Sequence, residues 1–356
     1  MAVALRCLLL LPALLLCCGA GAPAADGGLD IYFIDVMGGA STLIVTPEKE
    51  SILTDSGWAG FDDRDPKRIV HALKDVAGCD HLDHLITTHW HGDHFGGVAG
   101  VAKLVEIKRF WDHGLPEDND PDLDFSDGPK PGTPLITAYR TLSEGKRKAL
   151  RPGDRLPIRG LLETLVVASA GKVIGGPSAP TSQSKSNPNC AELPPEKSPG
   201  DRSDNSNSLA VRYRFGNFDF LDCGDLTWNH EAELVCPTNR IGSIDLFRVT
   251  KHGFDTSNNP VFLKTIAPTV AVMNNGPRKG GSPGTIHRLK EVPSIRDVFA
   301  LHKNEATGPE DNADPKLTAN RDPGGGEFIH VHVAPDGSKF TVRIGKDGPT
   351  RTYDSK

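Results

Sequence analysis

Residues 88–94 read Thr-His-Trp-His-Gly-Asp-His, and this stretch decides both the fold and the chemistry expected of the chain. Three imidazoles and one carboxylate lie within six residues, at the end of a run, 82–88, that we predict to be a strand. Imidazole nitrogens and carboxylate oxygens at this density suit Zn²⁺ and similar borderline cations. Gly92 allows the backbone turn that lets the side chains converge. We therefore interpret the stretch as a metal-binding loop, the alternative being a solvated His-rich loop.

Strand-like and helix-like segments alternate around this loop. The other predicted strands are 29–36, 41–45, 51–54, 107–111, 161–169, 209–215, 218–223, 245–250, 269–273, 298–301, 328–333 and 339–344. The predicted helices are one capped by Asp65 with Pro66 first, then 97–105, 133–150, 228–235 and 286–292. Residues 114–132 are an acidic loop rich in Pro and Gly. Residues 171–207 are a long polar loop insertion.

The N-terminus has the features of a secretory signal peptide over residues 1–24. Arg6 precedes the apolar run 8–16, and small residues follow it. We expect cleavage after Ala22 or Ala24, so that the mature chain has no membrane span and is periplasmic or extracellular. A retained anchor is an alternative.

The cysteines add two expectations for an exported chain. Lipid attachment at Cys17 or Cys18 is disfavoured because Leu16 precedes Cys17, where a small residue is usual. Signal removal leaves four cysteines, which permit two disulfides in three pairings: Cys79, Cys190, Cys223 and Cys236. Cys223 with Cys236 would close a short loop beside the expected site. Four buried thiols are the alternative.

Composition excludes several classes of protein. The net charge of −6 becomes −7 once Arg6, the one charged residue among the first 24, is removed. Because no basic stripe is visible, we expect no stable binding to nucleic acid. Gly and Pro together are about 19% of the chain against an average near 12%. This is not the composition of a coiled coil or a multi-span membrane protein, and it says nothing about oligomeric state.

The spacing His89-x-His91-x-Asp93-His94 resembles the HxHxDH metal motif of the metallo-β-lactamase superfamily. Residues 33–41 are similar to the "LDVGQGDA" opening of its ComEC-like members, the DNA-uptake-associated domains and their free-standing relatives. Further segments resemble that branch's "LIDTG", "NNSLVL", "LLTGD" and "VPHHG", in that order: 52–57, 207–209, 220–225 and 249–253.

The resemblance implies an α/β fold, the αββα four-layer sandwich, with metals at one rim. We expect this domain over residues 29–305, with the insertion at 171–207 inside it. Residues 306–356 would then be a linker and a C-terminal β-hairpin extension.

The same resemblance implies a set of site residues. The matches are His89 and His91 for a first metal, Asp93 and His94 for a second, Asp225 as the bridging carboxylate, His252 near the second metal and Asp55 as the acid that supports the histidine loop. The expected cofactor is Zn²⁺, one or two per chain, with Mn²⁺ or Fe as alternatives. Asp225, His252 and Asp55 each have a plainer interpretation, as a helix cap, a loop residue and a turn residue.

One departure from the family pattern concerns the first metal. Many members carry another histidine ligand before the bridging aspartate, but here His113 is the only histidine between His94 and Asp225, and it lies too early. The matching place reads Asp-Asn-Ser-Asn at 204–207. The first metal is therefore expected to be short of a ligand, weakly held or absent.

A second departure concerns the late "GHP" motif of the ComEC-like branch, which is not intact. The segment most similar to it is Gly-Thr-Ile-His at 284–287, which lacks the proline. His287 is a candidate extra ligand or acid, and His302 at a strand end is another. His330 and His332 share one face of the last hairpin, and we interpret them as structural.

The implied function is that of an exported metal-dependent hydrolase. A bound cation makes water acidic enough to supply hydroxide near neutral pH. Asp93 and Asp225 would orient it, and His252 is the candidate proton donor or oxyanion partner, so these three are the expected catalytic residues. The expected substrate is a small molecule or nucleic-acid fragment with a phosphodiester or other ester bond.

Two alternative functions stay open. The first is a lactone or β-lactam hydrolase, which the missing histidine disfavours, and the second is a non-catalytic metal-binding protein with a degraded site. Lys279, Arg278 and Arg288 could form a small basic rim, or simply belong to a solvated loop.

Overall fold

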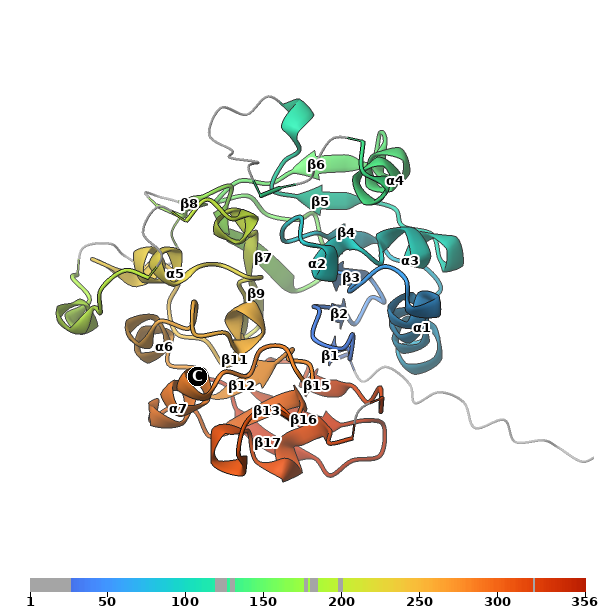
Figure 1. Cartoon of the computed structure of the whole chain (residues 1–356). Helices are drawn as coiled ribbons and strands as arrows, with labels where there is room; N and C mark the ends of the chain where they lie inside the picture. Colours follow the sequence, from blue (N-terminus) through green and yellow to red (C-terminus); the bar gives the residue numbers. More distant parts are fainter. Residues whose placement is uncertain are drawn as a thin grey trace, which may run out of the picture.

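Two β-sheets packed face to face form the centre of the molecule, with helices on both outer faces (Figure 1), so the expected αββα sandwich is confirmed. The computed structural model describes residues 27–118, 127–128, 132–175, 179, 185–197, 201–322 and 324–356. The expected signal peptide lies outside the described residues, as does part of the loop expected at 114–132. None of the helices in the described part of the chain has the length and apolar character needed to cross a lipid bilayer.

The first sheet has the strand order β17-β16-β15-β1-β2-β3-β4-β5-β6. Its strands are β1 (Leu29–Phe33), β2 (Thr42–Val45), β3 (Ser51–Thr54), β4 (His84–Ile86), β5 (Phe110–Asp112), β6 (Arg147–Ala149), β15 (Ile329–Val333), β16 (Lys339–Ile344) and β17 (Arg351–Asp354). From β3 to β6 the strands are parallel, so their carboxyl ends lie at one edge.

The second sheet has the order β14-β13-β12-β11-β10-β9-β7-β8. Its strands are β7 (Leu162–Ser169), β8 (Lys172–Val173), β9 (Ala210–Phe215), β10 (Phe218–Asp222), β11 (Leu246–Arg248), β12 (Val270–Met273), β13 (Asp297–His302) and β14 (Thr318–Asn320). β10 to β14 are parallel to one another, and this sheet also has one edge where strand ends gather.

The helices bury apolar faces against the sheets, and this produces three layers of core. The helices are α1 (Arg64–His71), which runs on into a π-helix (Ala72–Val76), then α2 (Gly92–Phe95), α3 (Val98–Leu104), α4 (Pro134–Ser143), α5 (Trp228–Val235), α6 (Pro260–Ile266) and α7 (Pro283–Glu291). α1, α3 and α4 cover the first sheet, and α5, α6 and α7 cover the second (Figure 1). A third cluster, which includes Phe33 and Phe220, fills the space between the sheets.

The C-terminal hairpin is part of the first sheet. β15 pairs with β1 along its whole length, from Leu29 opposite Val333 to Phe33 opposite Ile329. Without it, β1 would present unpaired N–H and C=O groups. β14, which lies in the segment expected as a linker, pairs with β13 in the second sheet.

Two predicted helices have different bounds in the structure. The helix predicted over 133–150 ends at Ser143, because Gly145 has a φ of 70° and the chain then turns into β6. α1 begins at Arg64, so Asp65 is not its cap. The carboxylate of Asp65 instead accepts hydrogen bonds from the Trp58 N–H at 2.9 Å and from Arg64 Nε at 2.6 Å.

The predicted pairing of Cys223 with Cys236 is wrong. Cys236 is bonded to Cys190, which lies in the insertion, with Cα atoms 5.8 Å apart. Cys223 is a free thiol, completely buried in the core beneath α5 and α6. Cys79 is also free and buried.

Candidate metal centre

Loops from both sheets meet at one rim and bring the predicted histidines and aspartates together. His89 follows β4, Asp93 and His94 lie in α2, and Asp225 follows β10. His252 lies in a short turn after β11, Thr250–Gly253. These side chains converge because the carboxyl ends of parallel strands share an edge.

The histidine loop is docked tightly on the loop that follows β3. Ser56 donates its backbone N–H to the carbonyl of His94 at 2.6 Å. Gly97 lies against the same loop, where a Cβ would come within 2.0 Å of the Ser56 carbonyl oxygen. Glycine is therefore required at this close approach, and the loop is fixed by backbone contacts as well as side chains.

His94 and His252 direct nitrogen lone pairs at the same point. His94 donates its Nδ1–H to Asp55 Oδ2 at 2.7 Å, and His252 donates its Nδ1–H to the carbonyl of Asn274 at 3.1 Å. When such a ring is neutral its Nε2 atom is an acceptor, and the two Nε2 atoms are 3.2 Å apart. Both rings are completely buried. A cation between two such lone pairs removes their repulsion, so the donors fit a metal ion.

Asp93 and Asp225 place carboxylate oxygens around these nitrogens. Asp93 Oδ2 lies 3.2 Å from His94 Nε2 and 3.0 Å from His252 Nε2. Asp225 approaches the same nitrogens at 3.3 Å and 3.4 Å. Asp225 Oδ1 is buried and lies 3.3 Å from His94 Nε2, but within the described part of the chain no donor reaches it with hydrogen-bond geometry. A buried carboxylate oxygen without a donor is costly, and coordination to a cation would satisfy it.

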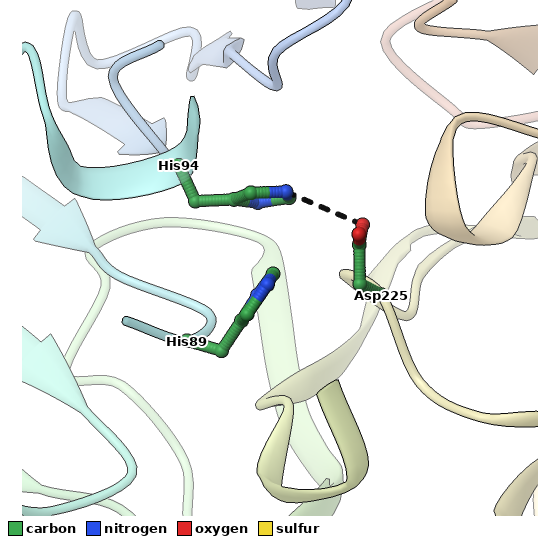
Figure 2. Close-up of side chains that lie close together, drawn as sticks. All are labelled: His89, His94 and Asp225. Atoms are coloured by element: carbon green, nitrogen blue, oxygen red, sulfur yellow. Dashed lines mark ion pairs between the residues drawn. The ribbon is translucent and has the colours of Figure 1, made fainter. Parts of the chain in front are cut away.

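Figure 2 shows the imidazole of His94 directed at the carboxylate of Asp225, with His89, from the start of the same histidine loop, reaching the same space. The ring centres of His89 and His94 are 4.0 Å apart. Two overlapping groups of three side chains could each hold a cation: His89, His94 and Asp225, and Asp93, His94 and His252.

The electrostatics of the cluster reflect two opposing effects. Burial alone would lower the pKa of His94, but Asp225, Asp93 and Asp55 together raise this pKa well above its usual value. Burial would raise the pKa values of Asp93 and Asp225, but the neighbouring histidines hold both well below the usual range. The pKa of His89 lies well below its usual value because of burial and the adjacent His94. The carboxylates are thus ionised and His89 is neutral, as metal ligands must be, whereas the proton that the carboxylates favour on His94 is one that a bound metal ion would displace.

His91, another predicted ligand, has one ring nitrogen beside the cluster and the other paired outside it. Its Nδ1 lies 3.0 Å from His89 Nε2, and its Nε2 lies 3.0 Å from Asp127 Oδ2. His91 is thus next to His89, but its Nε2 is paired with Asp127 and not with Asp225.

Asp55 lies under the histidine loop, in the position expected for a supporting acid. Besides the bond to His94, its Oδ1 accepts the Thr88 N–H at 2.8 Å and its Oδ2 accepts the Thr88 hydroxyl at 2.8 Å. One buried carboxylate therefore fixes both the start of the loop and the ring orientation of His94.

Asp204, in the segment 204–207 that matches the missing family histidine by sequence, lies beside the histidine loop and was not among the predicted site residues. Its Oδ2 accepts the Trp90 N–H at 2.5 Å and lies 3.3 Å from His113 Nε2, while its Oδ1 accepts Asn207 Nδ2 at 3.1 Å. Since Trp90 separates His89 from His91, Asp204 holds the backbone between these two residues. In the sequence, the one feature that pointed to Asp204 was the match of residues 204–207 to the position of the missing histidine ligand.

Of the predicted basic rim, one residue lies at the cluster. Lys279 Nζ contacts Asp93 Oδ2 and lies 4.9 Å from the ring centre of Trp58. Arg278 pairs with Glu305 at 3.2 Å, and Arg288 pairs with Asp255 at 2.8 Å.

The remaining candidate histidines have partners elsewhere. His287 lies on the exposed side of α7, 2.9 Å from Asp311. His302 is buried and lies 2.7 Å from Asp35 Oδ1. Neither belongs to the two groups that could hold a cation. His330 and His332 share Asp30 Oδ1 across β1 and β15, at 2.7 Å and 2.9 Å.

Residues 34–181 match the model of the family described as the "Metallo-beta-lactamase superfamily". A 73-residue stretch is 29% identical to "Beta-lactamase-like protein 2 homolog" of Caenorhabditis elegans, covering 20% of this chain and 23% of that protein. The chain thus spans about a quarter of the length of this curated relative.

Two solved structures have a similar arrangement of chain. One is described as a metal-dependent hydrolase from Parabacteroides distasonis, with 14% identity, a TM-score of 0.43, and coverage of 76% of this chain and 92% of that one. Another is CmlA, a diiron β-hydroxylase from Streptomyces venezuelae, with 13% identity, a TM-score of 0.39, and coverage of 68% and 44%. At these values the likeness carries no information on activity. The segment 34–181 that matches the family model includes the histidine loop of the cluster, so the metallo-beta-lactamase superfamily is the family that this part of the chain resembles.

Proposed function

We propose that the protein is a metal-dependent hydrolase that cleaves a phosphodiester or another ester bond. The observation that carries this proposal is the pair of buried Nε2 atoms of His94 and His252, 3.2 Å apart, with two carboxylates around them. Both rings have their Nδ1 atoms engaged outside the cluster, so both lone pairs face inward when the rings are neutral. Such a constellation is unfavourable unless a cation sits among the donors.

The residues divide between two cation positions in this proposal. Asp93, His94 and His252 would hold one cation, and His89, with His91 after a change of rotamer, would hold the other. Asp225 would serve both. Nitrogen donors mixed with carboxylates favour Zn²⁺, with Mn²⁺ and Fe as alternatives. A cation bound there supplies Lewis acidity and increases the acidity of water.

The side chains of the cluster have distinct tasks in hydrolysis. A carboxylate oxygen of Asp93 or Asp225 that is not bound to a cation accepts a hydrogen bond from the attacking water and orients it. The water oxygen forms a bond to phosphorus or carbonyl carbon, and the bond to the leaving oxygen breaks. One water proton finally resides on the leaving oxygen, so a phosphodiester gives a phosphomonoester and an alcohol. Since His252 Nδ1–H is engaged with Asn274, we assign His252 to holding the cation and not to proton donation.

The finer parts of the proposal come from the sequence. The ComEC-like motifs favour phosphodiester substrates, namely small molecules or nucleic-acid fragments. The signal-like N-terminus favours export to the periplasm or the extracellular space, with which the disulfide between Cys190 and Cys236 is compatible.

Metal content and turnover of the purified chain test the proposal. We expect stoichiometric metal and hydrolysis of bis(p-nitrophenyl) phosphate or single-stranded DNA in preference to a lactone or a β-lactam. His252→Ala should abolish turnover, whereas His287→Ala, a matched histidine on the surface of α7, should leave it unchanged. Substoichiometric metal without turnover of any substrate would refute the proposal and favour a non-catalytic protein.

A further inference from the structure

We propose that Lys279 is a substrate-binding residue, whose ammonium group binds an anionic oxygen of the substrate beside the metal centre. This inference rests on the proposed function and specifies its substrate as one that carries negative charge next to the scissile bond. Lys279 contacts Asp93, a carboxylate that would also bind the metal ion.

The loop that carries Lys279 is held rigidly at the rim. It follows β12 and forms a tight turn in which the Gly276 N–H donates to the Lys279 carbonyl at 2.8 Å. Gly276 packs on the loop after β1, where a Cβ on Gly276 would lie 2.9 Å from the Cα of Gly38. Asn304 Nδ2 donates to the Gly280 carbonyl at 3.0 Å. The backbone position of Lys279 is thus fixed from both sides.

The ammonium group lies between the cluster and solvent. It contacts Asp93 Oδ2 and lies near the face of Trp58, and the Lys279 side chain is 29% exposed. Stacking near an indole face favours the extended position of the cation. Lys279 is therefore in contact with the cluster and also partly open to solvent, as a residue that binds an incoming substrate must be.

Asp93 cannot serve Lys279 and a metal ion equally well. Its Oδ2 already faces His94 and His252, within 3.2 Å and 3.0 Å. A cation held by these two rings takes this oxygen as a ligand, and the carboxylate charge is then shared. Within the described residues, Asp93 is the one carboxylate paired with Lys279. The ammonium is then beside a cationic centre with its negative partner neutralised, which favours binding of a substrate anion there.

The other two residues of the predicted basic rim, Arg278 and Arg288, are paired with carboxylates outside the cluster. Arg278 is 85% exposed and pairs with Glu305, and Arg288 pairs with Asp255. Lys279 differs from them because its cation faces the ligands of the centre. It presents a compact point charge, which suits a phosphodiester oxygen or a carboxylate without imposing a bidentate geometry.

Binding of inorganic phosphate and of acetate to the zinc-loaded full chain tests the inference directly. We expect Lys279→Ala to weaken phosphate binding about tenfold or more, as measured by calorimetry, because a charge-assisted hydrogen bond is lost. Acetate in parallel separates the two sources of an anionic oxygen, since an effect confined to phosphate identifies a phosphoester. Arg278→Ala is the matched control and should bind phosphate as the wild type does.

Two further measurements separate this inference from the proposed function. Lys279→Ala should raise KM for bis(p-nitrophenyl) phosphate, an anion, while KM for p-nitrophenyl acetate, a neutral ester, stays unchanged. Zinc affinity should not fall, because a cation has been removed from beside Asp93. Phosphate binding that is unaltered in Lys279→Ala, or lost only together with zinc, would overturn the inference. Binding that depends on Lys279 in a protein that hydrolyses nothing would instead overturn the proposed function alone.

Discussion

Glu231 makes the stability of this fold depend on pH in a way that can be measured. It lies in α5 and is completely buried, and its Oε2 accepts the Asn259 N–H at 2.8 Å. Its Oε1 has no hydrogen-bond partner in the described part of the chain. Burial raises the pKa of Glu231 from 4.5 to about 8, since the ionised form loses its hydration.

The sign follows from linkage between proton binding and folding. The folded state binds the proton of Glu231 more tightly than the unfolded state, so the stabilisation is complete below pH 4.5 and is lost as the pH rises through about 8. This difference between the pKa of Glu231 in the folded and in the unfolded state changes the free energy of unfolding by roughly 5 kcal/mol in total. About 4 kcal/mol of this change falls between pH 5 and pH 9.

The variant Glu231→Gln removes this titration while it keeps the shape of the protonated acid. We expect urea unfolding to give similar stabilities for variant and wild type near pH 5, and a variant more stable by about 3–4 kcal/mol at pH 8–9. Glu233→Gln is the matched control, because Glu233 is exposed on the same helix. If the stability of Glu231→Gln falls with pH in parallel with the wild type, Glu231 does not titrate in this range and the reasoning is refuted.

Two further expectations concern the centre and the insertion. Asp204→Asn should weaken zinc binding about tenfold to a hundredfold in competition with a chromophoric chelator, because Asp204 fixes Trp90 and His113 beside the ligands; unchanged affinity would contradict this role. Cys190→Ser should cost up to about 4 kcal/mol, since the disulfide with Cys236 spans 46 residues of sequence. Reductant should lower the melting temperature of the wild type and leave that of Cys190→Ser unchanged, and equal sensitivity of the two proteins would argue against this bond.

The fold could be predicted largely from local sequence patterns. Strands such as β3 and β7 were predicted nearly to their ends, because apolar residues mark both faces of a strand buried in a sandwich. The cluster was also accessible, since four of its side chains come from the single stretch 88–94. β6, however, reads Arg-Lys-Ala and has no apolar pattern, so only its pairing with β5 identifies it.

What sequence could not supply are contacts between distant segments. Cys190 follows a polar stretch with no local reason to reach α5, and the bond to Cys236 depends on how the insertion packs there. The pairing of His113 with Asp204 joins residues 91 positions apart. His302 is a candidate ligand by sequence, but in the structure it is paired with Asp35. Each of these depends on the three-dimensional arrangement of the two sheets.

The pairing of β1 with β15 bears on when the protein can fold. β1 begins at Leu29, yet its partner residues run from Ile329 to Val333, near the opposite end of the chain. The first sheet therefore cannot be completed until the chain has been synthesised past Val333, and such distant pairing slows folding. For a chain exported as proposed, we expect this order of events to keep the polypeptide open during translocation, with its native sheet closing only on the far side of the membrane.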